Sequence, residues 1–270
     1  MKQLLKYPGS KWSYADWILS FFPPHKIYLE PFFGSGACFF RKKPSRRETI
    51  NDIDEMVVNF FNICRERPEE LARLIYLTPY ARAEYEAIQE AHAGENIKLS
   101  GDNLEDARRF AIRCSQSFGS KLADRAGWKT NRDSKGPIAP KVWGRMPQTV
   151  IKVAERLRDA QIECKPATEL IKDYNFDDCL IYADPPYIGD TRGGRLYRKE
   201  MMGRQEHVEL LRILKKHKGS VIISGYENEL YNAILQGWHT EQKLGYSDGA
   251  SQRIETLWMN FEPNTQMKIF

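Results

Sequence analysis

Residues 26–37, KIYLEPFFGSGA, decide the predicted fold class, because they pass from an apolar strand through a small-residue turn into the start of a helix. The strand is expected over 26–30, and the apolar run at 38–40 continues the helix. The same order repeats at once, with a strand over 49–52 and a helix over 55–65. Two such units in succession are typical of a parallel sheet. We therefore expect a Rossmann-like α/β core.

The pattern changes after residue 66 and returns near residue 160. Ser13 and Asp16 resemble a capping box, so a first helix is expected to begin there and to end at Pro23-Pro24. The later expected elements are helices from Pro68, over 82–92 and over 104–118, a loop over 119–147, a helix over 150–157, strands over 162–165, 179–183 and 221–224, and an edge hairpin of 238–243 and 254–261. We therefore predict a core of residues 1–66 and 160–270, interrupted by a mostly helical insert, 67–159.

The positive charge is concentrated in the insert. The net charge is +5, but residues 108–158 hold thirteen Lys or Arg against three acidic residues, a net +10. Phe118, Trp128 and Trp143 lie among these basic residues. This mixture predicts a nucleic-acid surface, and a solvated helical face with a loop is the alternative.

Composition excludes several other classes of protein. A hydrophobic content of 41% suffices for a core, and no stretch approaches the roughly 18 apolar residues of a membrane span. The opening MKQLLKYPG breaks too early for a signal peptide, so a cytoplasmic protein is expected. Five cysteines without CxxC spacing favour reduced thiols, and five histidines lack metal-ligand spacing. We expect no metal, no membrane association and no obligate protein partner.

The turn at Gly34-Ser35-Gly36 lies where an α/β sheet binds nucleotide-like ligands. A dinucleotide fingerprint would place a third glycine at position 39, which is Phe39, so a pyrophosphate is disfavoured. Asp52 follows Gly34 by 18 residues, close to the spacing of about 20 for an acidic residue that binds ribose. S-adenosylmethionine has a ribose and no pyrophosphate. The alternative is a plain glycine turn with Asp52 or Asp54 as a helix cap.

A second chemical signal is Asp184-Pro185-Pro186-Tyr187, which follows the apolar run 179–183. The two prolines predict a stiff, extended loop whose carbonyl oxygens can accept hydrogen bonds. A carboxylate, carbonyl oxygens and an aromatic face suit a flat group that carries an exocyclic amine, such as a nucleobase. A structural Pro-Pro turn is the alternative for this stretch alone.

Five islands in this order resemble the Dam-like, alpha-group DNA adenine N6-methyltransferases. They span nearly the whole chain: LKYPGSK (5–11), EPFFGSGA (30–37), NDID (51–54), YADPPY (182–187) and ETLWMNF (255–261). The resemblance implies a methyltransferase core with an inserted DNA-recognition domain. It also implies S-adenosylmethionine as methyl donor, S-adenosylhomocysteine as product and double-stranded DNA as partner.

The resemblance also implies residue roles. Residues 184–187 would be catalytic, with Asp184 between cofactor and target base. The cofactor would be bound by Tyr7, Lys11, Glu30, Phe32, Gly34, Ser35, Gly36, Asp52, Ile53 and Asp184. This chain has Tyr7 where the family usually has Trp, and Thr168-Glu169 is only a weak match to the family's adenine-reading motif.

The expected mechanism is direct attack of an adenine amine on the sulfonium methyl. The Asp184 carboxylate and the Pro185 carbonyl would accept its two N–H groups, and Tyr187 would stack on the ring. The adenine would first be flipped out of the duplex. Residues expected to contact DNA are Lys121, Arg125, Lys129, Arg132 and, in a Gly-rich basic loop, Tyr197.

Alternatives keep part of this chemistry. Relatives that act on cytosine N4 tend to have Ser, and those that act on glutamine Asn, at the position of Asp184; RNA adenine is a further target. A cytosine-C5 enzyme requires a cysteine nucleophile, usually after proline, and no Pro-Cys occurs. A DNA-binding relative without catalysis is a different class, which the set Lys11, Asp52, Asp184 and Tyr187 disfavours.

Overall fold

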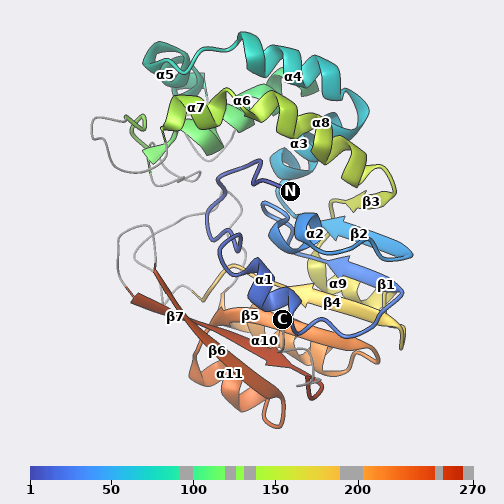
Figure 1. Ribbon diagram of the computed structural model, residues 1–270. Helices are drawn as coiled ribbons and strands as arrows, with labels where there is room; N and C mark the ends of the chain where they lie inside the picture. The colour runs from blue at the N-terminus through green and yellow to red at the C-terminus, as the bar shows by residue number, and fades with distance from the viewer. Residues whose placement is uncertain (92–99, 119–125, 131–137, 189–202, 247–251, 264–270) are drawn as a thin grey trace. The chain divides into compact units, whose positions relative to one another are not determined.

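A computed structural model describes residues 1–91, 100–118, 126–130, 138–188, 203–246 and 252–263. These residues form two compact units. The sheet unit holds the described residues of Lys11–Ile53, Ala160–Gly194 and Met201–Phe270, and the helical unit those of Met1–Ser10 and Asp54–Asp159 (Figure 1).

The sheet unit is built on seven strands in the order β3-β2-β1-β4-β5-β7-β6. Strands β1 to β5 pair in parallel, and β7 is antiparallel to both β5 and β6. This order confirms the expected Rossmann-like α/β sheet, and its edge hairpin contributes β7 as an internal strand. The strands are β1 Ile27–Glu30, β2 Arg47–Asn51, β3 Ala160–Glu163, β4 Cys179–Ala183, β5 Ser220–Tyr226, β6 His239–Tyr246 and β7 Gln252–Met259.

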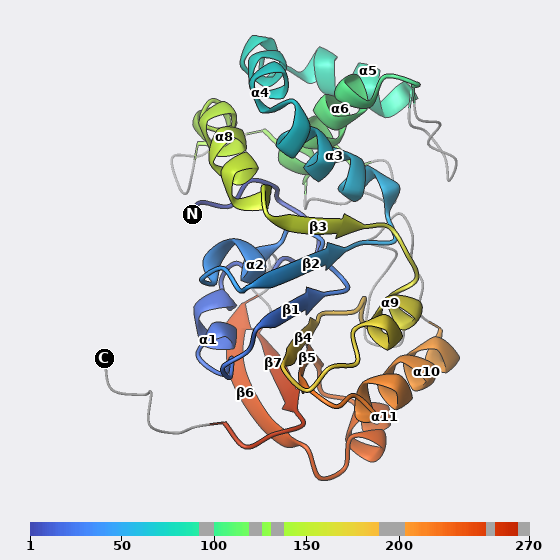
Figure 2. The same ribbon diagram turned by 90° about the vertical axis from the view of Figure 1, so that its right-hand side faces the viewer.

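Helices cover both faces of this sheet. One face carries α1 (Ala15–Leu19) and α2 (Ala37–Arg41), and the other carries α9 (Ala167–Asp173), α10 (Arg204–Lys215) and α11 (Glu229–Ile234) (Figure 2). Burial on both faces explains why the central parallel strands β1, β4 and β5 are mainly apolar.

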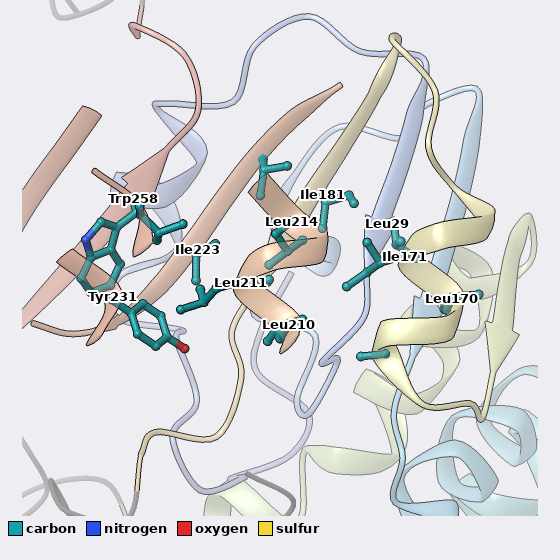
Figure 3. Close-up of a cluster of buried hydrophobic side chains, with 14 of the residues drawn as sticks. Leu29, Leu170, Ile171, Ile181, Leu210, Leu211, Leu214, Ile223, Tyr231 and Trp258 are labelled. Atoms are coloured by element: carbon teal, nitrogen blue, oxygen red, sulfur yellow. The ribbon is translucent and has the colours of Figure 1, made fainter. Parts of the chain in front are cut away.

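A cluster of buried apolar side chains lies between the sheet and α9 to α11. Leu210, Leu211 and Leu214 of α10 pack with side chains of β1, β4 and β5, and Tyr231 of α11 packs on Trp258 of β7 (Figure 3). Alternate strand residues bury on the opposite face, where Phe22 lies against Tyr28 and Tyr182.

The first helix differs from its prediction. Helix α1 begins at Ala15, its N-cap Tyr14 makes no side-chain capping bond, and it ends at Leu19 rather than at the prolines. The Asp16 carboxylate instead pairs with Arg41 of α2, 2.6 Å from Nη2 to Oδ1. The predicted capping box of Ser13 and Asp16 is therefore wrong, because the Asp16 carboxylate forms an ion pair with Arg41 instead of capping the helix.

The helical unit contains α3 (Glu55–Glu66), α4 (Pro68–Leu77), α5 (Arg82–Ala91), α6 (Asn103–Gln116), α7 (Ala139–Trp143) and α8 (Met146–Leu157). Helix α3 packs on α6 and α8, and α4 packs on α8. Helix α7 and the start of α8 lie within residues 119–147, which were predicted to be a loop. That prediction is wrong for these helical residues. Pro140 and Pro147 begin these helices, and Trp143 and Met146 are buried.

Helix α3 belongs to the helical unit. Its apolar face explains this grouping, because Phe60 lies 5.8 Å from the ring of Phe110 on α6. The sequence-based division places α3 in the catalytic core instead. The division into a catalytic core and a DNA-recognition insert stays a prediction.

All five cysteines are free thiols, and no helix among the described residues has the length and apolarity to cross a bilayer.

Candidate active site

The carboxyl ends of four parallel strands meet at one edge of the sheet, and each carries a polar side chain. Glu30 ends β1, Asp52 follows β2, Asp184 follows β4, and Ser224 lies near the end of β5. The register aligns these ends, pairing Leu29 with Ile181 and Ala183 with Ile223. This is the edge at which open α/β sheets bind ligands.

The glycine turn after β1 is held against β2. Gly34 and Gly36 have φ values of 50° and 66°. The N–H of Gly34 donates to Oδ2 of Asp52 at 2.8 Å, and the N–H of Phe33 donates to the carbonyl of Asn51 at 2.9 Å. A Cβ on Gly36 would lie 2.4 Å from the Phe33 ring. Both glycines are therefore required by the backbone.

The neighbouring acids have separate roles. Asp54 caps α3 by accepting the N–H of Met56 at 2.9 Å, whereas Asp52 binds the glycine turn. Asn51 fixes the neighbouring backbone and is not among the expected site residues. Its amide donates to the carbonyls of Pro31 and Lys165 and accepts the N–H of Lys165.

Glu30 is buried at the end of β1. It accepts a hydrogen bond from the Tyr28 hydroxyl at 2.7 Å. Burial raises the pKa of Glu30 to about 8, and the nearby charge of Asp184 acts in the same direction. A cationic ligand group beside Glu30 would therefore lower its pKa and favour the ionised carboxylate.

The Asp184 carboxylate is bonded by two donors at one oxygen. Its Oδ1 lies 2.8 Å from Nζ of Lys11, and it accepts the Ser224 hydroxyl at 2.8 Å. Ser224 is in turn bonded to the Tyr182 hydroxyl at 2.9 Å. Lys11 is buried, with a side chain 5% exposed, and Asp184 remains 18% exposed. The geometry fixes the carboxylate while leaving it accessible.

Tyr187 joins this cluster through its hydroxyl. Lys11 donates to that oxygen at 2.7 Å, and the hydroxyl donates to both oxygens of Glu255 at 3.1 Å. Burial raises the pKa of Tyr187, so its hydroxyl stays a neutral donor. The Tyr187 ring lies 4.2 Å from the ring of Tyr226, which fixes its plane.

Other residues expected at the site are placed as follows. Pro185 and Ser35 are buried, and Pro186 and Ile53 are half-buried near the same strand ends. Phe32 is half-buried and packs against the apolar cluster of Figure 3. Tyr7 belongs to the helical unit, where it is buried 6.5 Å from the Phe110 ring. Its cofactor role stays a prediction.

Most of the expected DNA contacts lie outside the described residues, namely Lys121, Arg125, Arg132 and Tyr197. Lys129 is described, and its backbone is fixed. Its N–H donates to the carbonyl of Gln116 at 2.7 Å, and its carbonyl accepts the Tyr80 hydroxyl at 2.7 Å. Glu169 is exposed in the first turn of α9.

The basic segment is only partly a surface. Arg108 and Arg109 pair with Glu105 on α6, and Arg113 is buried. Trp143 is also buried, with its indole N–H bonded to the carbonyl of Thr78 at 2.8 Å. Its predicted part in a nucleic-acid surface is therefore wrong, because it packs in the core. The exposed basic residues in this segment include Lys141, Arg145, Lys152 and Arg158.

Three further residues of the cluster were missed from sequence. Ser224 and Tyr226 lie on β5, and Glu255 lies on β7 opposite Tyr226. Glu255 opens the island ETLWMNF (255–261) that carries part of the family resemblance, but no role was expected of it. Among the described residues, no group of His, Cys, Asp or Glu has the arrangement of a metal site.

A sequence profile of the D12 class N6 adenine-specific DNA methyltransferases matches residues 7–245. The chain belongs to this family. A curated relative, the type II methyltransferase M.MjaIII of Methanocaldococcus jannaschii, is 21% identical over 267 residues, which cover 90% of each chain. The family match thus agrees with the resemblance found in the five sequence islands.

Solved structures show weaker likeness. Precorrin 8w decarboxylase of Methanobacterium thermoautotrophicum has a TM-score of 0.41 at 12% identity, covering 95% of this chain and 94% of its own. A SAM-dependent methyltransferase of Agrobacterium tumefaciens has a TM-score of 0.39 at 12% identity, covering 94% and 61%. The fold assignment therefore rests on the strand order of this D12-class protein itself.

Proposed function

We propose that this protein transfers a methyl group from S-adenosylmethionine to the N6 amine of an adenine flipped out of duplex DNA. The observation that supports this most is the position of Asp184. It follows β4, at the sheet edge that carries the Gly34 turn, and it is held by Lys11 and Ser224 while still 18% exposed. Membership of the D12 class supports the same reaction.

The residues at this edge fit S-adenosylmethionine. The carboxylates of Glu30, Asp52 and Asp184 end or follow adjacent strands. Three acids suit a ligand with an ammonium, a sulfonium and ribose hydroxyls, and they would repel a pyrophosphate. When bound, this cofactor supplies an electrophilic methyl group. Glu30 would face its methionine end, Asp52 its ribose and Ile53 its adenine ring.

Asp184 and its loop would activate the target amine. An adenine amine is a poor nucleophile, because its lone pair is delocalised into the ring. Hydrogen bonds from its two N–H groups to the Asp184 carboxylate and the Pro185 carbonyl localise that lone pair. Tyr187, fixed by Lys11, Glu255 and the Tyr226 ring, would stack on the base. These residues also align the amine for direct displacement.

Duplex DNA is the proposed partner, and base flipping follows from the site. An amine inside a stacked pair cannot reach a carboxylate at a sheet edge. Exposed Lys141, Arg145 and Lys152 of the helical unit support a role in phosphate binding. Lys121, Arg125, Arg132 and Tyr197 remain proposed contacts from sequence.

The direct test uses purified protein, methyl-labelled S-adenosylmethionine and duplex DNA. We expect label in DNA with the wild-type protein, S-adenosylhomocysteine as product, and no transfer by Asp184→Ala. Thermal melting checks that the variant folds. Label only in RNA or protein substrates supplied in parallel, or undiminished transfer by a folded Asp184→Ala, would contradict the proposal.

A further inference from the structure

Glu255 has no part in the proposed methyl transfer, yet it is built into the cluster around Asp184. It lies on β7, its side chain is 3% exposed, and both its oxygens accept the Tyr187 hydroxyl. A carboxylate buried this deeply is costly unless a cation compensates it. Lys11 is the described cation closest to this role, 3.7 Å from Oε1.

Lys11 is shared unequally between two carboxylates. Its Nζ lies 2.8 Å from Asp184, within hydrogen-bond distance, and 3.7 Å from Glu255, beyond it. The Tyr187 hydroxyl, 2.7 Å from Nζ, bonds to the same Glu255 carboxylate. A small movement of the lysine end would exchange its direct bond from Asp184 to Glu255 and keep its bond to Tyr187.

The proposed reaction calls for such a movement. The Oδ1 atom of Asp184 already accepts from Lys11 and Ser224, so a target amine would have to use Oδ2 of a carboxylate whose charge Lys11 already compensates, unless Lys11 moves. An ammonium bonded there also withdraws the negative charge that would polarise the target amine. Asp184 therefore acts best on an amine once Lys11 has moved away. A lysine that lost every carboxylate partner in this buried place would be strongly disfavoured.

We propose that Glu255 is a positioning residue that receives the Lys11 ammonium when the target amine takes its place on Asp184. The inference rests on the proposed function, because it presumes an amine substrate at Asp184. Lys11 would thus compensate Asp184 before the substrate binds and Glu255 afterwards. The buried charge stays balanced in both states.

The surroundings of Glu255 predict a pH signature. Burial raises its pKa to about 7, while the charge of Lys11 opposes that rise. Titratable and charged groups around it are Lys11, Asp184, Tyr187, Tyr14, Tyr226 and, opposite on β6, Lys243. The kcat/KM for transfer should therefore decline as pH falls below about 7, where Glu255 of the free enzyme becomes protonated and cannot receive the ammonium.

The kinetic test compares Glu255→Gln and Glu255→Asp with Glu241→Gln, a control on the adjacent strand β6. Glutamine can still accept the Tyr187 hydroxyl but carries no charge. For Glu255→Gln we expect a kcat at least tenfold below that of wild type. Its KM for DNA and its Kd for S-adenosylmethionine should stay within about twofold of wild type, and its kcat/KM should not show the decline below about pH 7. Glu255→Asp should recover part of the rate, and Glu241→Gln should match wild type. A wild-type kcat in Glu255→Gln would overturn the inference. So would a loss of substrate binding and of folding stability as large as the loss of kcat.

A second readout does not depend on turnover. Carboxylate carbon NMR of glutamate-labelled protein, with the Glu255 signal assigned from Glu255→Gln, follows its ionisation with and without DNA and S-adenosylhomocysteine. We expect the apparent pKa of Glu255 to fall by at least one unit when DNA binds, because Lys11 draws closer. An unchanged value in a complex that forms overturns the exchange alone. A wild-type protein that neither binds nor methylates DNA overturns the proposed function, and the exchange with it.

Discussion

The Nζ atom of Lys11 lies 2.8 Å from Oδ1 of Asp184 and 2.7 Å from the Tyr187 hydroxyl. One buried cation therefore links the N-terminal part of the sheet unit to the loop after β4. In the expected roles Lys11 binds cofactor, whereas in this structure it bonds directly to the proposed catalytic acid. The charge of Lys11 consequently bears on both the stability and the reactivity of the loop.

Replacing Lys11 by Met keeps much of its length and removes its charge. Asp184 and Glu255 would then lie near each other without a compensating cation. Removing one partner of a buried ion pair costs about 3–5 kcal/mol. We expect Lys11→Met to lower the free energy of unfolding on this scale and methyl transfer by at least about 100-fold. Lys11→Arg should retain more of both. Denaturant unfolding and single-turnover assays measure the two effects. A fully stable, active Lys11→Met would show that Lys11 does not compensate the two carboxylates.

Glu30 predicts a pH dependence of stability. Its pKa rises from the ordinary 4.5 to about 8 on folding, so the folded state holds a proton that the unfolded state has lost between these values. The stabilisation by this proton is complete below about pH 4.5 and is lost as pH rises to about 8, with a slope of up to ~1.4 kcal/mol per pH unit.

Glu30→Gln removes this proton linkage. We expect the difference in unfolding free energy between the variant and wild type to favour the variant increasingly from pH 5 to pH 8. Denaturant melts at several pH values measure it. A difference that is constant over this range would show that Glu30 titrates normally in the folded protein.

Gly36 and Gly237 form a matched pair for the glycine turn. Both have positive φ, 66° and 88°, so alanine is strained at either position. Only at Gly36 would the new Cβ meet other atoms, 2.4 Å from Phe33 and 2.6 Å from Phe40, whereas nothing lies within 4 Å at Gly237. We expect Gly237→Ala to cost about 1 kcal/mol and Gly36→Ala to cost about 1–3 kcal/mol more. Equal losses in thermal or denaturant unfolding would refute the tight packing of this turn.

The exposed basic residues predict a salt-dependent effect on DNA binding. Arg145 and Lys152 lie on or beside α8 and are exposed, as is Lys172 of α9, which serves as the control. We expect Arg145→Ala and Lys152→Ala each to weaken duplex binding and to reduce the slope of log K against log salt by about 1, with Lys172→Ala unchanged. Fluorescence anisotropy at several salt concentrations measures the slope. Slopes identical to wild type would place the DNA contacts elsewhere.

The centre of the sheet was predictable because β1, β4 and β5 are short, mainly apolar runs that end at turn or polar residues. Residues 26–40 predict β1, the turn and α2, and the structure agrees within one or two residues. The predicted start of the first helix failed, because Asp16 pairs with Arg41, a contact invisible to local sequence. Helix α7 was missed because the basic, Gly-rich composition around it outweighed the buried Trp143.

The chemistry of the site was predictable only where residues adjoin in sequence. Asp184 and Tyr187 share one loop, and the Gly34 turn precedes Asp52 by a recognisable interval. Glu255 and Ser224 reach Asp184 through the antiparallel and parallel pairing of β5 with its neighbours. Such pairing is set by tertiary structure, and no periodicity in the sequence reports it.

The atom that receives the methyl group defines the proposed reaction. Duplex DNA methylated by the wild-type protein can be digested to nucleosides and analysed by mass spectrometry, with an Asp184→Ala reaction as the blank. We expect N6-methyladenine as the product, absent from the blank. N4-methylcytosine or 5-methylcytosine in its place, or no methylated nucleoside from a folded wild-type protein that binds S-adenosylmethionine, would contradict the proposed reaction.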